Sequence, residues 1–95
     1  HIDSPRHFVE GGRPIDELDL SQLLVPAYVI DISAKAHADY ELSEQDVIDA
    51  EQTQGAILPG SLVIVLTGWH RYWHEPLTYR GADAAGHMHF PRISL

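Results

Sequence analysis

The chain has 95 residues, which is too short for more than one domain. Hydrophobic residues make up 44% and charged residues 21%, the proportions of a globular protein. Its 14 acidic and 6 basic residues give a formal charge of −8, which argues against nucleic acid or an anionic membrane surface as a partner. No apolar run is long enough to span a bilayer, and the absence of cysteine excludes disulfides and thiolate zinc sites. We therefore expect a cytoplasmic protein.

The first third of the chain predicts a loop, a short helical turn and a strand. Residues 1–14 contain prolines and a glycine pair and predict a loop that follows a strand outside the chain. Residues 15–24 place their leucines near one side, as in a short helical turn. Residues 27–33 (AYVIDIS) are rich in β-branched side chains and predict a buried strand.

Residues 43–53 (SEQDVIDAEQT) predict a helix with defined ends. Ser43 is suited to cap the first turn, and Asp46 occupies the reciprocal position three residues later. Gly55 follows the last helical residue, where glycine commonly ends a helix. We expect Val47 and Ile48 to face the sheet.

Residues 61–67 (SLVIVLT) form the strongest predicted strand. Their continuous apolar character predicts that both faces are covered. Residues 68–86 predict a long polar and aromatic loop, and residues 87–90 predict a short strand. We expect the strands of residues 28–32 and 61–67 to be neighbours in an α/β sheet.

The first seven residues concentrate groups that bind metals and move protons. On an extended segment His1 and Asp3 point to the same face, where they could share a zinc or manganese ion. Pro5 then bends the chain, which could return His7 towards the same site as a base. The alternative is a solvated terminus with incidental histidines, because this spacing is not a general metal motif.

The same stretch resembles the second half of the signature H-x-G-T-H-x-D-x-P-x-H-F of the cyclase-like metal-dependent hydrolases, which include kynurenine formamidase and isatin hydrolase. The matching residues are His1, Asp3, Pro5, His7 and Phe8. The similarity continues in the same order through Gly11-Gly12, residues 15–18, residues 29–32, Leu58-Pro59-Gly60, residues 66–69, Phe90-Pro91 and residues 93–95.

The resemblance implies a function and a fold. It implies that His1 and Asp3 are ligands of zinc or manganese and that His7 is the catalytic acid/base. The substrate would be a small amide or cyclic amide. The implied fold is a swivelling β/β/α-type domain of the α/β class, with a mixed sheet and at least one packed helix. Residues 1–95 would then form a single partial domain.

Three departures from this family leave an alternative open. The first half of the signature and the family's downstream ligands are absent, and Arg92 stands where the family usually has glycine. The chain could therefore be a catalytically inactive, truncated member that acts as an oligomeric or interaction module. Because both strands are apolar on each face, we also expect a homo-oligomer or association with a missing remainder.

The other histidines are weaker candidates for site residues. His87 and His89 have the same-face spacing of a strand, but such a pair more often lies at the surface than on a metal. His37 is expected to be solvated. The cluster Trp69, His70, Trp73 and His74 either lines a pocket or covers the sheet edge, with the histidines facing solvent.

Overall fold

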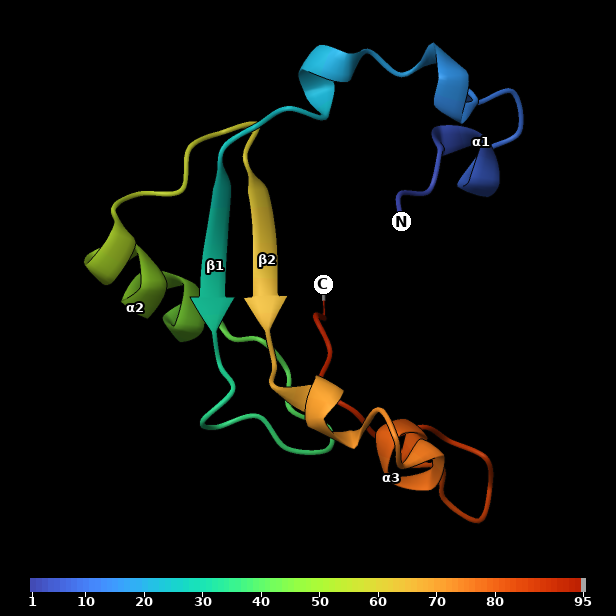
Figure 1. The fold of residues 1–95 in the computed structure, drawn as a ribbon, viewed down its shortest axis with the longest axis vertical. Helices are drawn as coiled ribbons and strands as arrows, with labels where there is room; N and C mark the ends of the chain where they lie inside the picture. Colours follow the sequence, from blue (N-terminus) through green and yellow to red (C-terminus); the bar gives the residue numbers. More distant parts are fainter. Residues whose placement is uncertain (95) are drawn as a thin grey trace.

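The computed structural model describes residues 1–94 and belongs to the mixed α/β class. Two parallel strands, β1 (Ala27–Asp31) and β2 (Leu62–Leu66), form the sheet, and the helix α2 (Glu44–Gln54) lies beside β1 (Figure 1). The remaining elements are short helical turns: α1 (Pro5–Phe8), the 3₁₀ turns η1 (Ile15–Glu17), η2 (Leu20–Gln22) and η3 (Trp69–Tyr72), and α3 (Pro76–Arg80).

The two strands are neighbours, as their sequences predict, and they pair in parallel. Ala27 lies opposite Leu62 and Asp31 opposite Leu66, with the three residues between them in register. A parallel pair needs a long connection, and α2 lies within it. The predicted neighbouring strands and the predicted helix are therefore confirmed. Within residues 1–94 the sheet is a parallel pair, so the antiparallel strand of a mixed sheet is not found there.

Side-chain contacts define the start of α2, and backbone geometry at a glycine defines its end. Ser43 Oγ accepts a hydrogen bond from the backbone N–H of Asp46, and the Asp46 carboxylate accepts one from the backbone N–H of Ser43. Gly55 ends the helix with φ of 87°, a left-handed value that costs glycine little. The capping pattern predicted from the sequence is confirmed.

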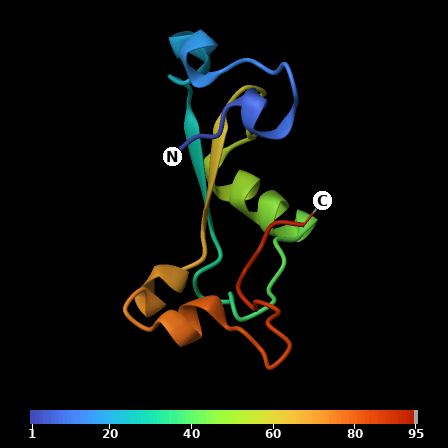
Figure 2. The same ribbon diagram turned by 90° about the vertical axis from the view of Figure 1, so that its right-hand side faces the viewer.

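The small core leaves much of the sheet uncovered. Ile30 and Ile32 are the buried hydrophobic residues, each 2% exposed. Leu62, Ile64 and Leu66 on β2 are exposed. The expected cover on both faces is therefore wrong for the described residues, because α2 packs against β1 and no second layer faces β2 (Figure 2).

Three predicted loops and strands differ from the structure. The predicted loop of residues 68–86 contains η3 and α3, and the predicted loop of residues 1–14 contains α1. In both α1 and α3 a proline sits at the start of the helix, where its missing N–H is not needed. Residues 87–90 are not a strand; instead Arg92 forms an isolated bridge with Glu41.

The two ends of the sheet carry different parts of the chain. The N-terminal segment, with α1, lies beyond the amino ends of the strands, whereas η3 and α3 lie beyond their carboxyl ends (Figure 1). Within residues 1–94, no helix has the length and apolar character needed to cross a membrane.

Candidate functional site

The structure brings His1 and Asp3 together. His1 Nε2 lies 3.6 Å from Asp3 Oδ2, and the side chains are 87% and 46% exposed. Two donors bonded to one tetrahedral zinc ion at about 2.0–2.1 Å lie roughly 3.3–3.4 Å from each other. The two side chains therefore fit a divalent metal ion in donor type and in spacing, and both are accessible to it.

His7 lies on α1, four residues beyond Asp3. The turn begins at Ser4, whose carbonyl oxygen accepts a hydrogen bond from the His7 N–H at 2.9 Å. The exposed imidazole packs edge-to-face against Phe8, with ring centroids 4.8 Å apart. Among residues 1–94, no three histidine, aspartate or glutamate side chains gather closely enough to hold a metal ion. The convergence of His7 with the His1–Asp3 pair thus stays a prediction.

A tight turn over residues 9–13 holds α1 in place. Arg6 donates from its backbone N–H to the Arg13 carbonyl at 3.1 Å and from Nε to the Gly12 carbonyl at 3.2 Å. Gly12 itself lies so close to α1 that a Cβ there would sit 2.8 Å from the carbonyl carbon of Pro5. The sequence marked the glycine pair only as a loop signal, so its packing role against α1 was missed.

A cavity of about 330 Å³ opens beside the carboxyl end of β2. Its lining is largely aromatic and apolar and consists of Thr67, Trp69, Tyr79, Arg80, Met88, Phe90 and Pro91. The Trp69 indole N–H donates to the Tyr79 carbonyl at 3.0 Å, which fixes the ring in the cavity wall. Trp69 is thus a pocket residue, while Trp73, His70 and His74 are exposed.

Comparisons with known proteins agree with the sequence signature. The profile of a family described as "Putative cyclase" matches residues 1–94. The fold is similar to the crystal structure of an isatin hydrolase bound to the product analogue thioisatinate, with a TM-score of 0.77 and 28% sequence identity. That match covers 97% of this chain and 37% of the isatin hydrolase chain, so this chain spans little more than a third of that protein. No curated protein matches the sequence.

Proposed function

Because the chain belongs to the cyclase family, we propose that it is part of a metal-dependent hydrolase that opens a small amide or cyclic amide. The observation that carries the proposal is the His1–Asp3 pair, whose donor atoms lie 3.6 Å apart. The similarity to an isatin hydrolase supports the substrate class, because isatin contains a cyclic amide. That similarity also supports a swivelling β/β/α-type fold for the whole domain.

His1 Nε2 and Asp3 Oδ2 would hold the metal ion, zinc or manganese. Such an ion supplies Lewis-acid polarisation of the amide carbonyl and lowers the pKa of water. Catalytic zinc sites use three protein ligands, so the proposal requires at least one further ligand from outside residues 1–94. A longer chain or a partner chain would provide it, in keeping with the 37% coverage of the isatin hydrolase.

His7 would move the proton. An imidazole nitrogen accepts a proton from the attacking water and returns it to the leaving amide nitrogen near neutral pH. The exposed ring of His7 is accessible for both transfers. Contacts between Arg6 and the turn of residues 9–13 hold the α1 turn on which His7 lies.

We propose as well that the chain associates, with copies of itself or with the remainder of a longer protein. The observation that supports this is the exposure of apolar side chains on both faces of β2, which include Leu62, Val63 and Ile64. Two-stranded sheets are rarely stable alone, and free strand edges pair readily with other strands.

The cytoplasmic location expected from composition stays a prediction.

A hydrolysis assay tests the proposed function. A form of the protein that supplies the further ligand is loaded with Zn²⁺ or Mn²⁺ and given isatin or an aryl formamide, and ring opening or deformylation is followed by absorbance. The expected result is turnover that requires the metal and is removed by chelation. Turnover that does not require metal would contradict the proposal. Absence of turnover in every longer form of the protein that contains residues 1–95 would contradict it as well.

A further inference from the structure

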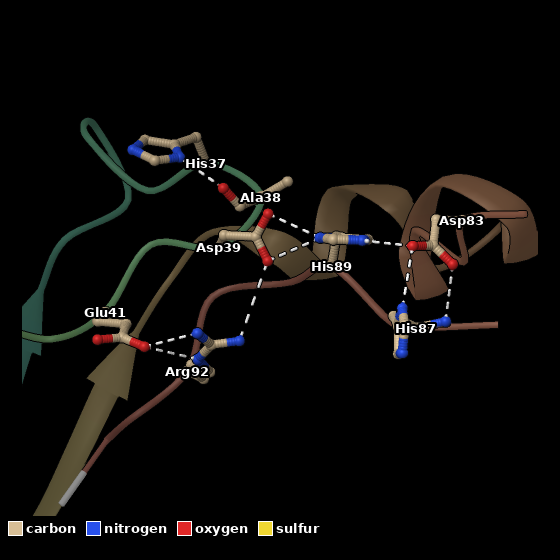
Figure 3. Close-up of polar contacts among 8 residues, drawn as sticks. All are labelled: His37, Ala38, Asp39, Glu41, Asp83, His87, His89 and Arg92. Atoms are coloured by element: carbon tan, nitrogen blue, oxygen red, sulfur yellow. Dashed lines mark hydrogen bonds and ion pairs between the residues drawn. The ribbon is translucent and has the colours of Figure 1, made fainter. Parts of the chain in front are cut away.

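His89 lies between two carboxylates that come from separate segments of the chain (Figure 3). Its Nδ1 is 2.8 Å and 2.7 Å from the two carboxylate oxygens of Asp39, fifty residues earlier in the sequence. Its Nε2 is 3.6 Å from Oδ2 of Asp83. Each ring nitrogen of His89 therefore faces a carboxylate.

Only the protonated ring satisfies both neighbours. A neutral imidazole carries one N–H, so it donates to one carboxylate and presents a lone pair to the other. The imidazolium carries an N–H on each nitrogen and attracts both Asp39 and Asp83. The charge of His89 thus decides whether His89 attracts both Asp39 and Asp83 or only one of them.

The backbone at Asp39 adds a second, independent observation. Among residues 1–94, Asp39 alone of the non-glycine residues has a positive φ, 65°. Such a conformation costs most residues free energy, although aspartate and asparagine tolerate it better than others. The strained turn directs the Asp39 carboxylate at His89, so the contact helps to hold the turn.

Arg92 provides a neighbouring attachment between the same segments that does not depend on pH near neutrality. Its guanidinium donates to Glu41 Oε1 from Nη2 at 2.6 Å and from Nε at 2.9 Å. Its backbone N–H donates to the Tyr40 carbonyl at 2.8 Å, and its carbonyl accepts from Leu42 at 3.0 Å. Because a guanidinium stays charged, this attachment persists when His89 loses its proton.

The segment around His89 forms one wall of the cavity beside β2. Met88, Phe90 and Pro91, which flank His89 in sequence, line that cavity together with Trp69. We propose that Asp39, His89 and Asp83 form a pH-sensitive latch that ties residues 83–91 to the turn at Asp39 and sets the shape of this cavity wall. Release of the latch loosens the wall while Arg92 keeps the segment attached.

The direction of the pH response follows from the charges. The hydrogen bond to Asp39, with its negative charge, raises the pKa of His89 above the ordinary value. The backbone N–H of His87 lowers the pKa of Asp83, so that carboxylate stays ionised through the range in which His89 titrates. A raised pKa means that the latch is fully formed below about pH 6.5 and weakens as the pH rises through the His89 pKa.

Other polar and charged groups also lie near His89 and its two carboxylates. His87 Nδ1 lies 3.2 Å from Asp83 Oδ2 and competes for that carboxylate. Arg92 Nη1 lies 4.0 Å from Asp39 Oδ1. From α3, the carbonyl oxygen of Arg80 accepts from the His89 backbone N–H at 3.3 Å. A test must therefore distinguish the effect of protonating His89 from the effect of protonating His87.

Side-chain NMR and tryptophan fluorescence test the latch in the chain as it exists. The chain has two tryptophans, so Trp73→Phe leaves Trp69 as the only reporter in the cavity wall. The expected result is a His89 titration midpoint above about pH 6.5, accompanied by increased acrylamide quenching of Trp69 over the same pH range. Asp39→Asn, which tolerates the positive φ, should lower the midpoint, and His89→Gln should remove the quenching step.

Two controls make the outcome decisive. Asp16→Asn removes the same charge from η1 and should leave the His89 midpoint unchanged, and His87→Gln should preserve the Trp69 step. A His89 midpoint at or below the ordinary value would overturn the proposal. A quenching step that survives in both His89→Gln and Asp39→Asn would overturn it as well.

Discussion

Asp46 and Ser43 satisfy each other's backbone N–H groups at the start of α2. Asp46 Oδ2 accepts from the Ser43 N–H at 2.7 Å, and Ser43 Oγ accepts from the Asp46 N–H at 3.2 Å. The same carboxylate accepts from the Tyr40 hydroxyl at 2.9 Å and pairs with the Lys35 ammonium. Asp46 is the buried charged residue of the described chain and joins α2 to the segment that follows β1.

We predict that Asp46→Ala destabilises the fold by about 1–3 kcal/mol, because it removes the helix cap and leaves the Tyr40 and Ser43 donors without their acceptor. Urea unfolding followed by circular dichroism measures the change. Asp49→Ala, on an exposed face of the same helix, is the matched control and should cost much less. Equal losses in the two variants would contradict the capping role.

Stability should also fall in acid because of Asp46. Burial alone would raise the pKa of this carboxyl, but the Lys35 ammonium and the Ser43 and Tyr40 donors outweigh burial and hold the pKa well below its ordinary value. A lowered pKa contributes stability above the unfolded value of about 3.9 and loses it as the pH falls further. The acid-induced loss measured between about pH 4 and pH 2 should be smaller in Asp46→Asn.

The His1–Asp3 pair should bind divalent metal. We expect Zn²⁺ binding by the chain to weaken roughly tenfold or more in Asp3→Ala, since loss of a supporting group alone costs roughly 10–100-fold in metal affinity. Isothermal titration calorimetry gives the affinities. His74→Ala, which removes an exposed histidine elsewhere, serves as the control. Loss of Zn²⁺ binding in the control but not in Asp3→Ala would place the metal at another site.

His7→Ala should lower kcat for amide hydrolysis by about 10²–10⁴-fold, the usual contribution of a general acid/base. The measurement is the steady-state rate with saturating metal, in the shortest form of the protein that shows turnover. Metal affinity should change little, because His7 is proposed to move protons and not to bind the ion. An unchanged kcat would remove His7 from the mechanism.

Gly12→Ala should displace α1. The added Cβ would lie 2.8 Å from the Pro5 carbonyl carbon, and the overpacking should cost about 1–3 kcal/mol locally. Amide hydrogen exchange should increase over residues 5–13, and any activity that depends on His7 should fall with it. Glu10→Ala, in the same turn but exposed, should leave exchange unchanged. Unchanged exchange in Gly12→Ala would show that the turn adapts.

Ile64→Lys should reduce association of the chain. The substitution places a charge in the exposed apolar surface of β2, where a partner strand or layer would have to bury it. Sedimentation velocity at micromolar concentration measures the change in mass. Leu77→Lys on α3 replaces another exposed apolar residue outside the sheet and is the control. A monomeric wild-type chain with cooperative unfolding would contradict the proposed association.

The sequence by itself determined the elements whose information is local. The β-branched residues of β1 and β2, the Ser43–Asp46 capping pair and Gly55 each act within a few residues, so strand-propensity and capping rules locate them. The signature around His1, Asp3 and His7 likewise identified the cyclase family, because it consists of neighbouring residues.

Only the tertiary structure decided how distant segments meet. The contact of Asp39 with His89 joins residues fifty positions apart, and no periodicity in the sequence relates them. His87 and His89 have the spacing of residues on one face of a strand. The attraction of His89 to Asp39 and Asp83, however, competes with the backbone hydrogen bonds that would place this segment in a sheet. The exposure of β2 could likewise not be predicted from the sequence. An apolar run indicates that both faces of a strand need cover, but it does not indicate whether residues 1–94 provide that cover.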